Sequence, residues 1–129
     1  KTWEVAMQNA PPADAEASND SGIKTYVFSR TLDPGDVKDA ELVSENAGDL
    51  VRQLKQQDGK EICLMGGGDL ARGLFESGVI DEVGLNIHPV MLGRGVPLFY
   101  PMERRFGLEL IECKQFKNGC VYVLYRVIY

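Results

Sequence analysis

Three consecutive glycines, Gly66 to Gly68, interrupt the stretch EICLMGGGDLARGLFESG. Glycine inside regular structure costs about 0.5 to 1 kcal/mol relative to alanine, so a triplet marks either a tight turn or a close approach of something to the backbone. The run before it, residues 61–65, predicts a buried strand. Four apolar residues after it recur at helical spacing: Leu70, Ala71, Leu74 and Phe75. Gly78 is expected to end this helix.

Strand and helix signals alternate through the middle of the chain. Residues 24–30 (KTYVFSR) and 40–44 (AELVS) predict short strands. Residues 45–59 predict a helix with Gly59 at its C′ position, and residues 80–90 predict another strand. This alternation favours a parallel sheet joined by right-handed crossovers.

The C-terminal part of the chain has a different pattern. Residues 106–116 and 120–129 are two long strand-like runs joined by Lys-Asn-Gly at 117–119, and Asn-Gly is the strongest short signal for a hairpin. A two-residue turn at Asn-Gly would place Cys113 opposite Leu124. The last run is apolar on both faces, which predicts an inner strand or one covered by a partner. We therefore expect a mixed, mostly parallel α/β sheet with a C-terminal antiparallel hairpin.

Size, charge and cysteine content exclude several classes of protein. With 129 residues, 44% of them hydrophobic, the chain suits one domain, and a net charge of −5 argues against a nucleic-acid binder. The three cysteines, Cys63, Cys113 and Cys120, form no CxxC pair, so neither a disulfide framework nor a metal site is expected. A reducing, cytoplasmic location fits them best. The sequence shows no apolar run of about 18 residues and no signal-peptide pattern, which predicts a soluble protein.

The glycine turn has two physical explanations. A strand, glycines and a helix start direct free N–H groups and the positive end of a helix dipole to one point, which suits an anion. Without Cβ atoms, a pyrophosphate can lie against the main chain. However, neither G-x-G-x-x-G nor a P-loop motif is present, and Asp69 would repel a phosphate while serving well as a helix cap. The residues alone leave a phosphate site and a plain tight turn equally open.

The order of motifs along the chain is more informative than any one of them. KTWE at the start, VFSRTL at a strand end, the long segment from LMGGGDLARG to HPVMLGRGVPLF, and the terminal hairpin together resemble the dihydrofolate reductase-like superfamily. The branch it resembles is related to the reductase domain of the bacterial riboflavin-biosynthesis deaminase-reductase. The resemblance covers nearly the whole chain. It implies one domain, residues 1–129, with a three-layer α/β/α sandwich that binds NADPH.

The resemblance also implies which residues bind the cofactor. Lys1 and Thr2 match the end of a turn near the cofactor phosphates, and Ser29 and Arg30 match a pair that faces the adenosine 2′-phosphate. A guanidinium suits this role because it binds phosphate through two parallel hydrogen bonds, although a solvated arginine at a strand end is the alternative. The turn that takes the pyrophosphate is matched by Gly66, Gly67, Gly68, Asp69 and Leu70. A cis bond between the first two glycines is an expected feature of that turn.

Members of this family begin with a further strand, loop and helix that carry much of the substrate pocket. Nothing in the given sequence precedes Lys1, so we expect it to be part of a longer protein, since an unpaired sheet edge invites aggregation. His88, the single histidine, is expected to be structural or to lie at an interface. No residue can be assigned as the proton donor, so the catalytic residues stay unidentified.

The expected activity is NADPH-dependent hydride transfer to a C=N or C=O group of a pteridine-like or pyrimidine-like substrate, by a homodimer. In such a reaction the cofactor supplies the chemistry and the protein binds and orients. The alternative is a non-catalytic nucleotide-binding or dimerisation protein of the same fold.

Overall fold

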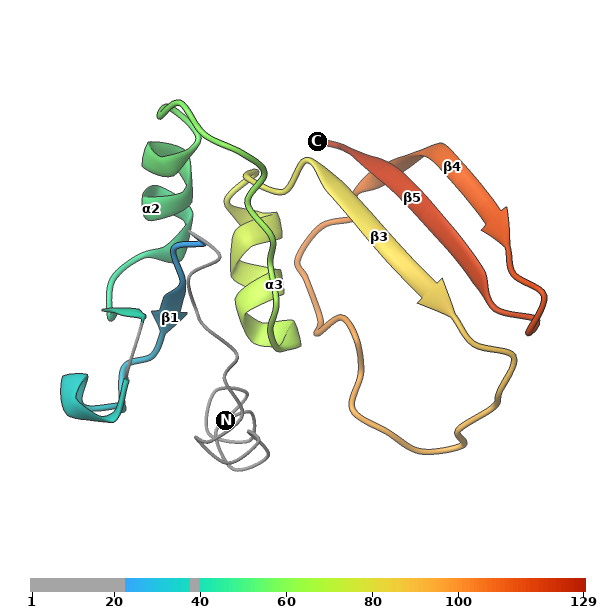
Figure 1. Ribbon diagram of the computed structural model, residues 1–129, viewed down its shortest axis with the longest axis horizontal. Helices are drawn as coiled ribbons and strands as arrows, with labels where there is room; N and C mark the ends of the chain where they lie inside the picture. The colour runs from blue at the N-terminus through green and yellow to red at the C-terminus, as the bar shows by residue number, and fades with distance from the viewer. Residues whose placement is uncertain (1–22, 38–39) are drawn as a thin grey trace.

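The computed structural model describes residues 23–37 and 40–129 (Figure 1). Lys1 and Thr2 lie outside this part of the chain. The elements follow in this order: β1 (Tyr26–Phe28), the 3₁₀ turn η1 (Pro34–Asp36), β2 (Glu41–Val43), α2 (Ala47–Leu54), α3 (Gly68–Glu76), β3 (Glu82–Ile87), β4 (Gly107–Gln115) and β5 (Val121–Ile128). The chain is therefore a mixed α/β protein. No helix in the described ranges is long and apolar enough to cross a membrane.

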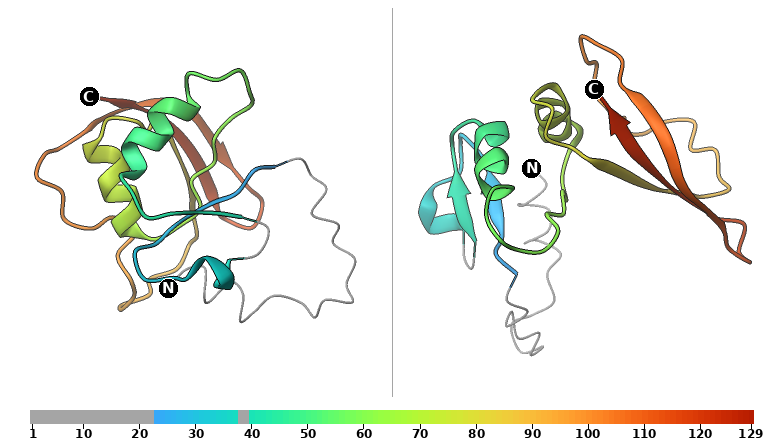
Figure 2. Two further views of the ribbon diagram at one scale, coloured as in Figure 1. Left: turned by 90° about the vertical axis from the view of Figure 1, so that its left-hand side faces the viewer. Right: turned by 90° about the horizontal axis from the view of Figure 1, so that it is seen from above.

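The strands form two separate sheets. β1 and β2 pair in parallel, while β3, β5 and β4 form an antiparallel sheet with β5 in the centre. Both figures show α2 beside the parallel pair and α3 between α2 and the three-stranded sheet (Figures 1 and 2). The inner position predicted for the last strand is confirmed. Of the three strand pairs among the described residues, one is parallel, fewer than we predicted.

The best-buried cluster lies where the two helices meet. Val51 of α2, Leu74 of α3 and Val79 after it are at most 9% exposed. The helical spacing of apolar residues in the sequence thus marks the faces that pack together. The helix predicted over 45–59 is confirmed but shorter, because α2 ends at Leu54 and Gly59 lies beyond its cap. Turn-type bonds follow instead, from the N–H of Gln56 to Gln53 and of Gln57 to Leu54.

The C-terminal end of α3 follows the prediction. Gly78 has a φ of 68°, the left-handed conformation that glycine adopts readily. Its N–H donates to the carbonyl of Phe75 at 3.0 Å, and the N–H of Val79 donates to Leu74 at 3.2 Å. This pair of bonds is the Schellman ending that satisfies the last carbonyls of a helix.

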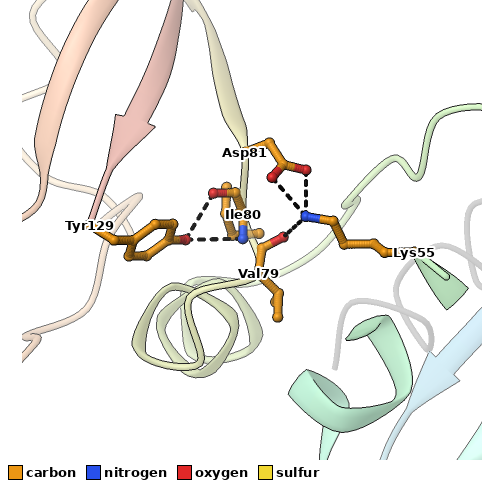
Figure 3. A network of polar contacts seen from close by, with 5 residues as sticks. All are labelled: Lys55, Val79, Ile80, Asp81 and Tyr129. Carbon is orange, nitrogen blue, oxygen red and sulfur yellow. Dashed lines mark hydrogen bonds and ion pairs between the residues drawn. The ribbon is translucent and has the colours of Figure 1, made fainter. Parts of the chain in front are cut away.

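The turn between α3 and β3 is fixed by side chains from two distant elements (Figure 3). Tyr129 Oη donates to the carbonyl of Ile80 at 2.8 Å and accepts from its N–H at 3.0 Å. Lys55 Nζ donates to the carbonyl of Val79 at 3.3 Å and pairs with the Asp81 carboxylate at 2.6 Å. Burial raises the pKa of Tyr129 above its usual value. Side-chain hydrogen bonds thus link the C-terminal end of α3 to the last turn of α2 and to the residue that follows β5.

The strand predicted over residues 61–65 is absent, so that prediction is wrong. The segment has no regular structure, and Ile62, Leu64 and Met65 are 52%, 38% and 86% exposed. A strand needs a neighbour to accept its hydrogen bonds, and β-propensity alone does not supply one. Within the described residues no strand pairs with this segment.

The predicted C-terminal hairpin is confirmed, but its register differs by one residue. The N–H of Phe116 donates to the carbonyl of Cys120 at 2.9 Å, so the turn has three residues rather than two. Asn118 Oδ1 accepts from the N–H of Cys120 at 3.1 Å, and Gly119 has a φ of 83°. A left-handed last residue is the usual feature of three-residue hairpin turns. Cys113 therefore faces Val123, not Leu124.

Candidate functional site

A hollow of about 390 Å³ lies beside the parallel strands β1 and β2. It combines polar groups with apolar walls. Its lining consists of Ser29, Arg30, Leu32, Pro34, Ala40, Leu42 and Ser44. The hollow thus contains both residues that follow β1 and that the sequence predicts as 2′-phosphate contacts.

Ser29 and Arg30 have different roles within the hollow. The Ser29 hydroxyl oxygen accepts hydrogen bonds from the N–H groups of Thr31 and Leu32, each at 3.2 Å. Its own N–H donates to the carbonyl of Val43 at 3.1 Å. Ser29 therefore shapes the turn after β1 and anchors it to β2. Arg30 is exposed, and no carboxylate of the described residues pairs with it, so its guanidinium is available to an anion.

The start of α3 is a second group of hydrogen-bond donors. Gly67 is the N-cap and provides no side-chain acceptor. The first N–H with a helical acceptor is that of Ala71, which donates to Gly67 at 3.2 Å. The amides of residues 68–70 have no acceptor in the described part of the chain, as expected for a first helical turn. Together with the helix dipole, these amides favour an anion.

The space around the backbone differs among the glycines of this turn. A Cβ on Gly68 would lie 3.0 Å from the carbonyl oxygen of Leu98 and 3.2 Å from the Tyr100 ring. Packing therefore explains this residue. A Cβ on Gly66 would meet only the side chain of Leu70, at 3.6 Å, an ordinary contact, so packing does not explain it. The peptide bonds of the described residues are trans, and the expected cis bond between the first two glycines is wrong.

Asp69 and Leu70, the other two predicted residues of this turn, also have partners within the protein. Asp69 Oδ1 pairs with Arg72 Nη2 at 2.6 Å, one turn along α3. The side chain of Leu70 packs against the core between the helices, which leaves only its backbone N–H for a ligand. Arg72 was missed by the sequence reasoning, although its position three residues after Asp69 indicates such a pair.

The predicted cofactor residues thus lie at two places rather than one. No hydrogen bond or ion pair in the described ranges joins Ser29 or Arg30 to the start of α3. Figure 1 shows the carboxyl end of β1 and the N-terminal end of α3 on the same side of the molecule, toward the bottom of the view.

The family of the chain follows from its match to a known domain. The model of the RibD C-terminal domain matches residues 5–122. The chain belongs to this family. The resemblance inferred from the motifs is thereby confirmed.

Two curated relatives come from Bacillus subtilis (strain 168), and both are uncharacterized proteins. YyaP is 39% identical over 103 residues, which are 80% of this chain and 54% of YyaP. YwjB is 33% identical over 91 residues, which are 70% of this chain and 52% of YwjB. The chain therefore spans about half the length of these relatives.

Two solved structures share the fold of this RibD C-terminal domain. A protein from Shewanella sp. PV-4, provisionally named for riboflavin biosynthesis, matches with a TM-score of 0.72 over 99% of this chain and 70% of its own, at 19% identity. A pyrimidine reductase-like protein from Corynebacterium diphtheriae matches with a TM-score of 0.54 over 70% of this chain and 38% of its own, at 24% identity. This chain thus shares the fold of both proteins.

Proposed function

We propose that this chain forms the cofactor-binding part of an NADPH-dependent reductase. The observation that carries the proposal is the uncapped start of α3 behind a glycine turn, on the same side of the molecule as the carboxyl end of β1. The residue pair after β1 includes Arg30, which pairs with no carboxylate of the described residues. Both features offer donors to anions, and a dinucleotide with a 2′-phosphate carries two anionic groups at a distance from each other. Membership of the RibD C-terminal domain family supports this cofactor class.

The residues present fit such a cofactor. We assign the 2′-phosphate to Arg30, and the apolar walls Leu32 and Leu42 of the same hollow suit the adenine ring. We assign the pyrophosphate to the amides of residues 68–70, with Gly66 leaving room for its approach and Gly67 offering no side-chain cap that would compete for these amides. Lys1 and Thr2, outside the described residues, complete the proposed set.

The proposed reaction is reduction of a C=N or C=O group in a pteridine-like or pyrimidine-like substrate. NADPH, when bound, supplies the hydride. The residues of this chain bind the cofactor and hold its two phosphate groups apart at fixed points. A small planar substrate is supported by the family and by the fold shared with a pyrimidine reductase-like protein.

The test is a titration of NADPH against the full-length protein, followed by its fluorescence. Arg30→Ala is expected to weaken NADPH about 10- to 100-fold while changing NADH little, because a charge-assisted hydrogen bond contributes about 1.5 to 3 kcal/mol. Arg126→Ala is the matched control, since Arg126 pairs with Glu109 on the distant sheet.

Equal losses for both cofactors would show that Arg30 does not bind the 2′-phosphate. No binding would reject the reductase, and binding without turnover of any substrate would favour the non-catalytic alternative.

We further propose that residues 1–129 belong to one domain of a longer protein with a three-layer α/β/α sandwich. The exposed apolar segment 61–65 and the separation of the two sheets support this. A strand from elsewhere in the longer protein would pair with this segment and join the sheets. Hydrogen exchange in the full-length protein should then show protected amides at 61–65, and rapid exchange there would contradict the sandwich.

We also propose that the protein is located in the cytoplasm. There it would form a homodimer through the three-stranded sheet. Tyr125 of the central strand pairs with Leu110 on one side and with Val83 on the other, so these three side chains share one face of the sheet. Leu108 and Leu110 are 49% and 55% exposed. Exposed apolar residues on an ordered strand favour burial by a partner. Light scattering at micromolar concentration is expected to give twice the chain mass. A monomer mass would reject the dimer.

A further inference from the structure

Asp69 poses an electrostatic problem for the proposed cofactor site. It is the second residue of α3, within the same turn whose amides are assigned to the pyrophosphate. An acidic residue there stabilises the helix through its dipole. The same negative charge repels a bound phosphate. A site that binds a dinucleotide at this point must therefore offset the charge of Asp69.

Arg72 has the geometry to offset that charge. Its Nη2 lies 2.6 Å from Asp69 Oδ1, while its side chain is 42% exposed and that of Asp69 73% exposed. Its Nε is buried and lacks a hydrogen-bond partner, the one such side-chain nitrogen or oxygen found in residues 23–37 and 40–129. A buried donor without an acceptor is costly, so this guanidinium has one buried donor that is not committed to any acceptor of the described residues.

A matching pair at the start of α2 shows what such a pair does where no ligand is proposed. Asp49 and Arg52 have the same spacing in the same part of their helix. There, Arg52 Nη2 also donates to the carbonyl of Ser77 at 2.7 Å, which ties α2 to the end of α3. Asn46 caps this helix. The α2 pair is thus accounted for by structure, whereas Arg72 contacts no acceptor besides Asp69 among the described residues.

We propose that Arg72 is a positioning residue whose charge neutralises Asp69, so that the start of α3 accepts the pyrophosphate of a dinucleotide. This inference rests on the proposed function. It assigns to Asp69 the stabilisation of the first helical turn and to Arg72 the removal of the repulsion that Asp69 would cause. Neither residue needs to contact the ligand.

The test is a double-mutant cycle in the full-length protein that removes the charges of Asp69 and Arg72 singly and together. Its readout is the dissociation constant of NADPH at low salt. Arg72→Gln leaves Asp69 unpaired and is expected to weaken NADPH about three- to tenfold. Asp69→Asn leaves Arg72 with an unpaired positive charge and is expected to tighten NADPH by a similar factor. The double variant should return to within about twofold of the wild type, because the positive and the negative charge are removed together and their opposite effects on binding cancel. Higher salt should shrink all three differences.

Two controls separate this role from a structural one. Arg72→Lys keeps the charge and is expected to bind within about twofold of the wild type. Asp49→Asn removes the acid of the matched pair in α2 and should leave the dissociation constant unchanged. Circular dichroism and urea unfolding confirm that each variant is folded. Should Arg72→Gln not fold, the tighter binding expected of Asp69→Asn still tests the proposal.

The outcomes that overturn the proposal are distinct. A double variant as weak as Arg72→Gln would show that Arg72 binds the phosphate itself. Unchanged binding in Arg72→Gln, or no tightening in Asp69→Asn, would show that the pair is structural only. A wild-type chain that binds neither NADPH nor inorganic pyrophosphate would reject the proposed function, and with it this role for Arg72.

Discussion

The two helices of this chain begin in contrasting ways. Asn46 closes the start of α2, where its side-chain oxygen accepts from the N–H of Gly48 at 3.0 Å. Gly67 stands at the same position of α3 and has no side chain to do so. Each helix has a buried glycine in its first turn, Gly48 or Gly68, and an Asp–Arg pair that follows. The comparison shows that similar local sequences produce one satisfied helix start and one with free amides.

The packing around the two starts differs as well. Gly48 lies under Ser77, so the start of α2 is pressed against the end of α3. Gly68 instead lies under the backbone of Leu98 and the ring of Tyr100, which come from the long connection between β3 and β4. The start of α2 is therefore part of the contact between the helices, whereas the start of α3 is held by a loop. Of the two, the start of α3 is the better candidate for a ligand.

Gly48→Ala should give the largest effect on stability. The new Cβ would clash with Ser77 Oγ and lie 2.6 Å from Ser77 Cβ, so the contact between α2 and the end of α3 must shift. Overpacking of this kind costs about 1 to 3 kcal/mol, measured as a lower midpoint in urea unfolding. Ser77→Gly in the same chain removes both clashing atoms and should recover part of the loss. An unchanged midpoint in Gly48→Ala would show that α2 and α3 are not held together at this point.

Asn46→Ala should give the next largest effect and separates stability from binding. Loss of the cap leaves the N–H of Gly48 without its acceptor, which costs about 0.5 to 2 kcal/mol. NADPH binding should stay unchanged, since no ligand is assigned to the start of α2. Weaker NADPH binding by a folded Asn46→Ala variant would contradict the contrast between the two helix starts.

The sequence predicted the parts of the fold that local geometry decides. Gly78 and Gly119 occupy left-handed positions that glycine accepts readily, so the end of α3 and the terminal hairpin were predictable. The segment 61–65 was not, because a strand depends on a neighbour from elsewhere in the chain. The exact hairpin register was missed because the side chain of Asn118 closes a three-residue turn.

The candidate site was also predictable from the sequence only in part. That a helix begins just after the glycine turn could be read from the sequence. That it begins uncapped could not, because Asp69 was expected to serve as a cap, whereas the N-cap is Gly67, which offers no side-chain acceptor. The packing of Gly68 against Leu98 joins residues 30 positions apart, and no local pattern contains it. The buried, unpartnered Nε of Arg72 likewise depends on the tertiary structure. Binding of NADPH by Arg30 and the glycine turn stays a prediction.

Tyr129→Phe tests how much the hydrogen bonds at the C-terminal end of α3 contribute to stability, for comparison with the cap at the start of α2. The variant loses both hydrogen bonds to Ile80 while keeping the ring, and we expect a loss of about 0.5 to 1.5 kcal/mol at pH 8. Because burial raises the pKa of Tyr129 in the folded state, its contribution is complete below about pH 10 and is lost as the pH rises through the raised value.

Urea unfolding between pH 8 and pH 11.5 measures this pH dependence. The wild type should lose stability faster than Tyr129→Phe as the pH increases, so that the two curves converge at alkaline pH. Tyr125→Phe, within β5, serves as a control for the general effect of removing a phenol. Parallel curves for the wild type and Tyr129→Phe would show that the phenol of Tyr129 does not contribute to the stability of the turn.

Gly67→Asn should change stability least and tests the comparison most directly, because it gives α3 the same capping residue as α2. The φ of −73° and ψ of 162° at this position suit any residue, so no strain opposes the change. Replacing glycine by asparagine at an N-cap gains only a few tenths of a kcal/mol. The new side chain would accept a hydrogen bond from the amide of Asp69 and so remove one of the donors assigned to the pyrophosphate, and NADPH binding should weaken by at least about tenfold. Asn46→Gly, the reverse exchange in α2, should cost a few tenths of a kcal/mol and leave binding unchanged. If Gly67→Asn binds NADPH as the wild type does, the free amides of α3 are not the pyrophosphate site, and the difference between the two helix starts has no part in function.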